Sequence, residues 1–493
     1  MILLIIELIE IIVKTIYNKI NVIFIIVSIN SKVLMIEGLI YLRLLEGDLI
    51  LVEKKYYDLT PSQKLMYLAL KCIPQKNVVN IGTAVWFHEN IDCELLKVAA
   101  YKAIWRMDAL RLRLKKVKGE IKQYVSEEEP KEIKIEDYSN YSKGYIDEVL
   151  EKWTSTPFKY NDKELYDVSI IKAPENITGL YIKVNHVIMD AWGLTVYAKD
   201  VIDIYLAMRD GKELPEGPMK FVPLIEEDLE YMNSKRMQKD YEFIKEKWKI
   251  PVVFSSVEPK YVGKKYRPNN LRYKGKQKVM SLDKNIVSRI NKFCKENRIS
   301  QQTLFILSSQ IYFYKLNNTD TSMINSVLSR RSSMDRKRAG GMMVNNLQLK
   351  VECPYGLSFK EACEKLTKEQ LELFRHGDFP YQLARDYVLK QLEIKSGVLT
   401  DFTITYQPAK IFTDNRVKAR VRNYFNGSAS MNLYLTIMDT LDSGELDFMF
   451  QYKVAVVSDE IVDELYRVMI KAVEIGIECP TKTIGEIIDE IYA

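Results

Sequence analysis

After Tyr57 the chain alternates between short runs of β-branched and aromatic residues and longer segments with apolar residues at helical spacing. Strands such as NIGTAVWFH need neighbouring strands to pair with, and the helices between them need a sheet to cover, so this alternation predicts an α/β architecture. The pattern runs through two halves of similar size, and the loop-like stretch GKELPEGP comes between them. We therefore expect two α/β lobes.

Local signals place several elements. LTPSQKLMYLALK has Thr60 as a helix N-cap and Pro61 at the first helical position. A helix is expected from Ile91 to Arg113, and strands are expected on both sides of the turn PENITG. In the second half, helices are expected at IVSRINKFCKEN and QQTLFILSSQIYFYKL, and strands at SMINSVL, MVNNLQLKV, DFTITYQ, MNLYLTIMD and ELDFMFQYK, the last two as a pair.

Several classes of chemistry lose support. The sequence contains no dinucleotide-type G-x-G-x-x-G, no G-x-x-x-x-G-K-[ST] and no G-x-S-x-G serine elbow. Lys and Arg number 72 and Asp and Glu 66, and the two signs are mixed along the chain, so the net charge of +6 is weak support for nucleic acid. No C-x-x-C pair is present, which predicts a reduced cytoplasmic chain with buried thiols and no metal site at Cys72, Cys93, Cys294, Cys353, Cys363 and Cys479.

Residues 1–52 are a compositional anomaly. Their apolar runs are interrupted every few positions by Glu, Lys or Asn, so a clean membrane span is not expected. Three interpretations stay open for residues 1–34: an amphipathic helix at a membrane interface, an additional packing element, and translated upstream sequence with the start at Met35. The last is preferred, and membrane contact through this stretch is not favoured.

Histidine, the side chain best suited to act as a base near neutral pH, occurs at three positions. His88 ends a strand pattern and is expected at the surface, and His376 precedes a proline-marked turn and is expected to have a structural or capping role. His186 ends the β-run LYIKVNHVIMDAWG, where a strand can hold a ring rigidly against a cleft. From these residues alone, a packed histidine beside an ordinary helix N-cap at Asp190 is the other interpretation.

The segment NHVIMDAWG resembles the HHxxxDGWS signature of nonribosomal peptide synthetase condensation domains, which belong to the chloramphenicol acetyltransferase-like acyltransferase superfamily. Other family motifs follow in order from about Tyr56 to the C-terminus. LTPSQKLMY resembles LSxxQ, RMDALRLRL resembles RHxxLRTxF, and TPFKYNDKELYDV resembles the segment before the histidine motif. SRRSSMDRKRAGGMMVNNLQLKV resembles GRxxx…GxFVNTLPLR, HGDFPYQL resembles HQDxPFxxL, and DFTITYQ resembles the family's late strand.

This resemblance implies an α/β fold of two chloramphenicol acetyltransferase-like lobes that form a V-shaped pseudo-dimer, with the active site in a tunnel at their junction. The expected domains are an N-terminal extension (1–55), an N-terminal lobe (56–224) and a C-terminal lobe (225–493). His186 corresponds to the family's catalytic histidine, and Asp190 to an aspartate that pairs with an arginine. Arg331 matches that arginine best, with Arg330 as the alternative if the register is off by one.

The signature also departs from the family pattern. Asn185 replaces its first histidine, Ala191 replaces its glycine, and Gly193 stands where serine is common, whereas Trp192 matches. These residues are expected to support the loop around His186. A Cβ at position 191 narrows the tunnel or tilts the loop, so altered donor choice and lost activity are both open.

The function that the resemblance implies is a free-standing acyltransferase that moves an acyl or aminoacyl group from a phosphopantetheinyl thioester to an amine, with His186 as general base or as the residue that positions the acceptor. No bound cofactor is expected. The acyl group arrives on the phosphopantetheine arm of a carrier protein in trans, or on CoA. Two alternatives stay open: an acyl-CoA-dependent alcohol O-acyltransferase that forms esters, and a condensation-like binding module that has lost its chemistry.

Overall fold

A computed structural model of the whole chain describes residues 54–249, 254–264, 266–407, 417–439 and 444–493, together with the backbone of four strands between Ile25 and Glu53. The chain forms two compact units. The smaller comprises Met1–Asp58 with Lys115–Val125, and the larger comprises Leu59–Leu114 with Ser126–Ala493.

The described part of the smaller unit is made of strands. One antiparallel sheet has the order β1-β2-β3-β4, with bounds Ile25–Ile26, Val33–Ile36, Ile40–Leu45 and Asp48–Glu53. In a second sheet, of order β5-β8-β7, the strands are Tyr57–Asp58, Glu120–Val125 and Leu112–Val117. Of residues 1–34, the structure describes only backbone that belongs to β1 and β2. The three interpretations of this stretch therefore stay hypotheses.

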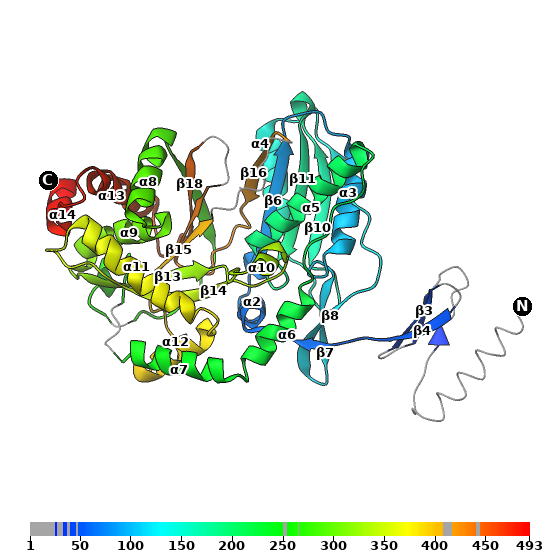
Figure 1. Cartoon of the computed structure of the whole chain (residues 1–493), viewed down its shortest axis with the longest axis horizontal. Coiled ribbons are helices and arrows are strands. Elements are labelled where there is room, and N and C mark those ends of the chain that lie inside the picture. The colour runs from blue at the N-terminus through cyan, green and yellow to red at the C-terminus, as the bar shows by residue number, and fades with distance from the viewer. Residues whose placement is uncertain are drawn as a thin grey trace, which may run out of the picture. The chain divides into compact units, whose positions relative to one another are not determined.

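The first lobe of the larger unit is built on a five-stranded sheet of order β16-β6-β11-β10-β9 (Figure 1). Its strands are β6 (Asn80–Phe87), β9 (Lys134–Asp137), β10 (Tyr166–Lys172), β11 (Thr178–Asn185) and β16 (Ala419–Tyr424). The helices of this lobe are α2 (Pro61–Cys72), α3 (Cys93–Arg106), α4 (Lys143–Ser155) and α5 (Ala191–Arg209). As the sequence predicts, Thr60 caps α2 and β10 pairs antiparallel with β11 across the PENITG turn.

Helices cover both faces of this sheet because its strands are apolar on both sides. The β11 residues alternate between the two faces, and all eight are buried. Tyr181 faces α4, where its hydroxyl lies 2.9 Å from Thr154 Oγ1. Leu180 and Ile182 point to the opposite face, on the side of α5.

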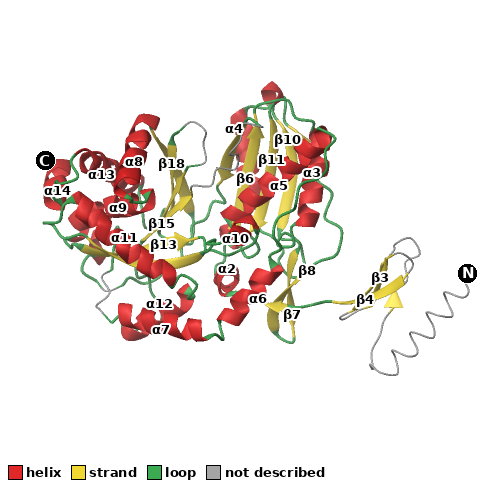
Figure 2. Ribbon diagram, in the orientation of Figure 1, coloured by secondary structure: helices red, strands yellow, loops and turns green. Residues whose placement is uncertain are grey.

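The second lobe is built on a six-stranded sheet of order β12-β18-β17-β15-β13-β14. Its strands are β12 (Gly275–Leu282), β13 (Thr321–Leu328), β14 (Asn345–Glu352), β15 (Phe402–Gln407), β17 (Leu433–Met438) and β18 (Leu446–Lys453). Figure 2 shows the helices gathered around it. They are α8 (Lys284–Asn297), α9 (Gln301–Asn317), α10 (Met334–Arg338), α11 (Phe359–Arg375), α12 (Tyr381–Gln391), α13 (Asp459–Glu478) and α14 (Ile484–Tyr492), and α6 (Val222–Tyr231) and α7 (Lys235–Lys247) connect the lobes.

Alternation gives this second sheet one apolar and one polar face. On the apolar face, Phe448 packs edge to face against Phe305 of α9 with ring centroids 5.1 Å apart, and Phe402 packs against Phe313 at 5.6 Å. On the other face, one cross-strand row runs through Gln348, Asn325, Thr403, Tyr434, Gln451 and Gln277. The helices therefore bury the apolar face, and the polar face is left for another role.

β16 links the lobes. It follows β15 of the second lobe in sequence, yet it pairs antiparallel with β6 of the first lobe, with Val421 opposite Val85. The sequence did not reveal this strand, because ARVRNY alternates with arginine and has no long apolar run.

Two expectations from the sequence are wrong. The helix predicted from Ile91 to Arg113 ends at Arg106, and β7 begins at Leu112. Met107 is the C-cap, and Asp108 in the turn that follows accepts hydrogen bonds from the backbone N–H groups of Phe221 and Val222. The thiols of Cys72 and Cys479 are exposed at helix ends, whereas Cys294, Cys353 and Cys363 are buried as predicted.

The expectation of an α/β fold with two lobes is confirmed, since each lobe has its own sheet and helices. The predicted boundary between residues 224 and 225 falls inside α6 and stays a prediction. In the part of the chain that the structure describes, no helix combines the length and apolar character needed to cross a bilayer.

Candidate active site

His186 lies where β11 ends. The backbone N–H of His186 donates to Val79 O at 2.7 Å, and that of Asn185 donates to Leu165 O at 2.8 Å. The side chain of Asn185 turns the chain after the strand, because its Oδ1 accepts a hydrogen bond from Val187 N at 3.0 Å. The residue that replaces the family's first histidine thus holds the loop by a local turn.

The His186 side chain is half-buried and lines a cavity of about 1230 Å³. Its Nδ1 is closed off from solvent beside the backbone of His186 and Met189, so Nε2 is the ring nitrogen left for a substrate. Burial lowers the pKa of His186 from its ordinary value, and this outweighs the opposite effect of the nearby Asp190 carboxylate. The imidazole is therefore neutral at pH 7 and can accept a proton.

Asp190 is held by four hydrogen bonds. Its Oδ1 accepts from Gly193 N at 2.9 Å, which caps α5, and from Arg331 Nη2 at 2.9 Å. Its Oδ2 accepts from Arg331 Nη1 at 2.8 Å and from Met343 N at 3.0 Å. The side chains of Asp190 and Arg331 are each 1% exposed, so this is a fully buried, bidentate ion pair between the two lobes.

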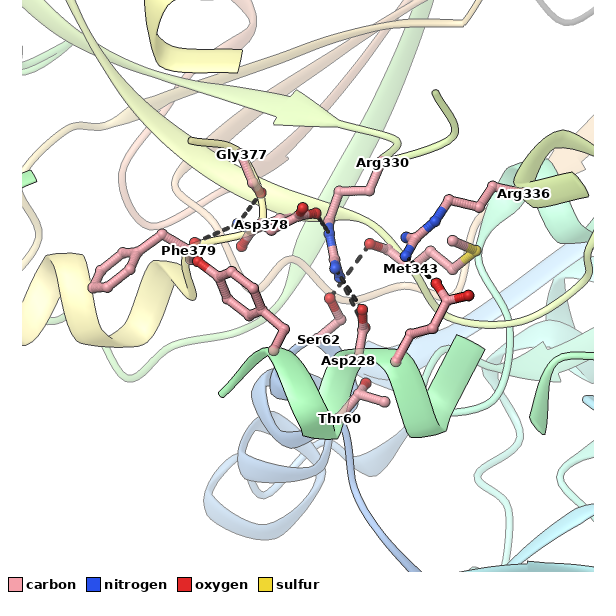
Figure 3. A network of polar contacts seen from close by, with 12 residues as sticks. Thr60, Ser62, Asp228, Arg330, Arg336, Met343, Gly377, Asp378 and Phe379 are labelled. Atoms are coloured by element: carbon pink, nitrogen blue, oxygen red, sulfur yellow. Dashed lines mark hydrogen bonds and ion pairs between the residues drawn. The ribbon is translucent and has the colours of Figure 1, made fainter. Parts of the chain in front are cut away.

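The structure separates Arg331 from its neighbour Arg330. Figure 3 shows the Arg330 side chain between Asp228 and Asp378. Its Nη1 and Nη2 donate to Asp228 of α6 at 2.9 and 2.6 Å, and its Nε donates to Asp378 Oδ1 at 2.8 Å. Arg331 is thus the residue that meets Asp190, and Arg330 ties the connection between the lobes to the loop before α12.

Gly193 and Met189 are fitted to each other. A Cβ on Gly193 would lie 2.2 Å from Met189 Sδ, a distance that only a shift of the buried methionine could relieve. Met189 Sδ in turn accepts a hydrogen bond from Gly341 N at 3.1 Å. Glycine at position 193 therefore leaves the space that the Met189 side chain of the same motif occupies.

Ala191 and Trp192 begin α5 and line the cavity. The indole Nε1 of Trp192 donates to Lys337 O at 2.9 Å, and the Arg331 guanidinium lies 5.9 Å from its ring centroid. Ala191 is the first residue of α5, and its φ is not positive. The backbone at this position therefore does not require glycine.

Gly341 closes the junction from the second lobe. Its φ of +117° is one that side chains rarely allow, and a Cβ there would lie 2.4 Å from Phe221 Cδ2. Its carbonyl accepts from Asp190 N at 3.2 Å and from Arg331 Nη2 at 3.3 Å. Sequence reasoning used this glycine only as an alignment point.

The cavity has two chemically different walls. The strands β6 and β11 and the helix α5 of the first lobe contribute mainly apolar side chains, among them Ile81, Val85, Leu180, Ile182, Leu194 and Ala198, whereas α4 and β16 add charged ones, including Lys143, Asp147, Arg420 and Arg422. The second lobe contributes the polar face of its sheet, including Gln277, Asn346, Thr405, Tyr434, Thr436 and Gln451. Sequence reasoning missed these residues, because no local signal says which face of a strand meets a cavity.

The other two histidines take the places expected for them. β6 ends at Phe87, and His88 follows it as an exposed residue at the edge of the same cavity. His376 caps α11, stacks on Phe243 with centroids 3.7 Å apart, and places Nδ1 2.7 Å from Asp240 Oδ1. Within the described residues, no three His, Cys, Asp or Glu side chains are grouped to hold a metal ion.

Curated relatives are components of nonribosomal peptide synthetases. One of the plipastatin synthase proteins of Bacillus subtilis is 24% identical over 435 residues, which are 87% of this chain. Surfactin synthase subunit 1 from the same organism is 27% identical over 452 residues, which are 88% of this chain. The matched regions are only 17% and 12% of those two proteins.

Solved structures share the fold. A variant of the starter condensation domain of rhizomide synthetase, in complex with C8-CoA, matches with a TM-score of 0.76 at 18% identity, over 87% of this chain and 97% of its own. The first condensation domain of the calcium-dependent antibiotic synthetase, in complex with a substrate analogue, also gives 0.76, at 16% identity over 88% and 98%. The sequence model of the condensation domain matches residues 53–488. The chain therefore belongs to the condensation domain family, whose members are acyltransferases.

Proposed function

We propose that this chain transfers an acyl or aminoacyl group from a phosphopantetheinyl thioester to an amine, with His186 as the catalytic residue. The observation that carries the proposal is a neutral imidazole on the wall of a cavity large enough for two substrates. Asp190 supports this assignment, since its lone pairs are taken up by Arg331 and backbone N–H groups. The carboxylate positions the loop and leaves the ring free.

The proposed step balances without a cofactor. The amine nitrogen attacks the thioester carbonyl, a C–N bond forms, and the C–S bond breaks. The proton that the amine loses passes to the imidazole of His186, which then returns it to the leaving thiolate. The products are an amide and a free thiol, and the imidazole ends neutral as it began.

The donor group arrives on a phosphopantetheine arm, supplied by a carrier protein or by CoA. The starter condensation domain that shares this fold was solved with C8-CoA, which supports an acyl-CoA or carrier-bound acyl donor here. The apolar first-lobe wall suits the alkyl part of such a group. The net charge of +6 suits an acidic carrier protein that binds from solution.

The departures from the family signature are compatible with activity. Asn185 keeps the loop in place through its bond to Val187 N, and Gly193 makes room for Met189. Ala191 adds a methyl group to the cavity wall. We expect this methyl group to change which donors fit the cavity. These contacts favour a working transferase over a binding module.

The test incubates the full chain with octanoyl-CoA or octanoyl carrier protein and a mixture of amines and alcohols, and it follows thiol release and product mass. Amine-dependent release with an amide product supports the proposal. An ester product would instead assign the chain to alcohol O-acylation. Failure to release thiol from either donor, while carrier protein still binds, would show a binding module.

A further inference from the structure

The polar face of the second-lobe sheet carries one pair that stands out. Gln277 of β12 lies directly opposite Gln451 of β18, and both line the cavity as half-buried residues. Gln451 Nε2 donates a hydrogen bond to Gln277 Oε1 at 2.9 Å. The pair therefore keeps one acceptor, Gln451 Oε1, and one donor, Gln277 Nε2, side by side and without another protein partner among the described residues.

The cross-strand row that contains this pair is uncharged. Tyr434 continues the same cross-strand row, and burial raises the pKa of its hydroxyl to about 12, so it stays neutral. Thr436 and Met449 form the next row. Among described residues of the six-stranded sheet that line the cavity, Asp447 is the single acidic or basic side chain, and its Oδ1 already accepts from Ser281 Oγ at 2.5 Å.

We propose that Gln277 and Gln451 bind an uncharged amide of a substrate, which donates its N–H to Gln451 Oε1 and accepts from Gln277 Nε2. A charged group beside this row would lose water without a counter-ion in the row, whereas an amide can exchange hydrogen bonds to water for hydrogen bonds to the two glutamines. The cavity thus has an apolar wall for an acyl chain and an amide-binding wall across from it.

This inference rests on the proposed function, because it takes the cavity to be the place where donor and acceptor meet. The amide has two chemical sources. One is a carboxamide or peptide bond of the aminoacyl or peptidyl substrate, and the other is the amide of the pantetheine arm that carries the donor.

The first experiment compares acceptors and donors with the wild type and the variants Gln277→Leu and Gln451→Leu, with Met449→Leu as a matched control on the same wall. The acceptors are the methyl esters of asparagine, aspartate and leucine, which have nearly equal size. The donors are octanoyl-CoA and the octanoyl thioester of ethanethiol, which has no amide.

If the substrate supplies the amide, wild type prefers asparagine ester over the other two by roughly tenfold in kcat/KM, and each glutamine variant loses that preference. If the pantetheine arm supplies it, wild type prefers octanoyl-CoA over the amide-free thioester by roughly tenfold, and the variants lose that preference instead. Met449→Leu keeps both. Glutamine variants that retain every wild-type preference would overturn the inference and leave the proposed function standing.

A second measurement does not depend on turnover. Calorimetry gives the Kd of pantetheine and of asparagine methyl ester for wild type, Gln451→Leu and the shape-conserving Gln451→Glu. At least one probe is expected to bind roughly tenfold more weakly to both variants. Equal binding by all three proteins would contradict the inference. If wild type releases no thiol but this weakening occurs, the transfer reaction is wrong and the amide site stands.

Discussion

His186 and Asp190 are four residues apart and have opposite environments. The histidine ring lines a cavity, and the aspartate is buried between the lobes, where it is bound by Arg331 and two backbone N–H groups. A base needs access to a substrate, whereas a positioning residue needs fixed partners. His186 is therefore suited to act as the base, and Asp190 is suited to hold the loop in position.

The pKa of His186 sets the acid limb of the expected rate profile. The neutral imidazole is the active form, and burial lowers its pKa, so a lower pH is needed to protonate it. We expect the half-point of the acid limb of kcat/KM, calculated per unprotonated amine acceptor, to lie below the ordinary histidine value of 6.5. A steady-state pH profile measures this, and a half-point above 6.5 would contradict the environment described for the ring.

The Asp190–Arg331 pair should contribute strongly to stability. Asp190→Asn leaves the Arg331 charge buried without its counter-ion, which is expected to cost about 3–5 kcal/mol in the free energy of unfolding. Lys199→Gln on the same helix removes an exposed partner of Asp203 and is expected to cost at most about 0.5 kcal/mol. Urea unfolding of the two variants gives the comparison, and equal midpoints would show that the buried pair is not what holds the loop.

Part of this site follows from local sequence and part does not. The spacing of His186 and Asp190 was also consistent with a packed histidine and an N-cap, and the family resemblance was needed to choose Arg331 over Arg330. The N-cap is real, but it is one of several roles of Asp190. The fit between Met189 and Gly193 has no signature, because it depends on the rotamer of one side chain.

At the scale of elements, the start of α5 combines capping with packing. Asp190 caps the helix, and Gly193 in the first turn packs against the Met189 side chain. The strands and helices with strong periodicity were predictable, including β17 paired with β18. β16 was not, because its role depends on pairing with β6, more than 300 residues earlier in the chain.

The contact between Gly193 and Met189 can be tested by a double-mutant cycle. Gly193→Ala introduces a Cβ within 2.2 Å of Met189 Sδ and is expected to destabilise the protein by about 1–3 kcal/mol. Met189→Ala alone leaves a cavity and also destabilises it. In the double variant the two costs should not add, and the coupling is expected to exceed about 0.5 kcal/mol. Strict additivity in thermal unfolding would mean that the two residues do not meet.

At the scale of the larger unit, the lobes share structural elements. β16 follows a strand of the second lobe in sequence, yet it is part of the first-lobe sheet. The Asp190–Arg331 pair and Gly341 connect the start of α5 to the second lobe. The two-lobe α/β architecture was predictable, because the alternation of strand-like and helix-like segments and the order of the family motifs both point to it. The chemistry of the cavity walls was not, because it arises where two sheets far apart in sequence face one space.

These shared elements predict cooperative unfolding of the two lobes. Gly341→Ala forces a shift at Phe221 and disturbs the bonds to Asp190 and Arg331, so it should weaken protection in both lobes together. Hydrogen exchange followed by mass spectrometry reports this through peptides from β11 and from β13. Faster exchange in one lobe alone would show that the lobes are energetically independent.

The most direct test of the central claim compares His186→Ala with wild type in transfer of the octanoyl group from octanoyl-CoA to an amine. We expect the variant to lose amide formation by at least about a hundredfold, since a positioned base contributes about that much or more. Its melting temperature should stay close to that of wild type, because the half-buried ring lies against a cavity and forms no ion pair. A folded variant that forms amide at the wild-type rate would contradict the catalytic role of His186.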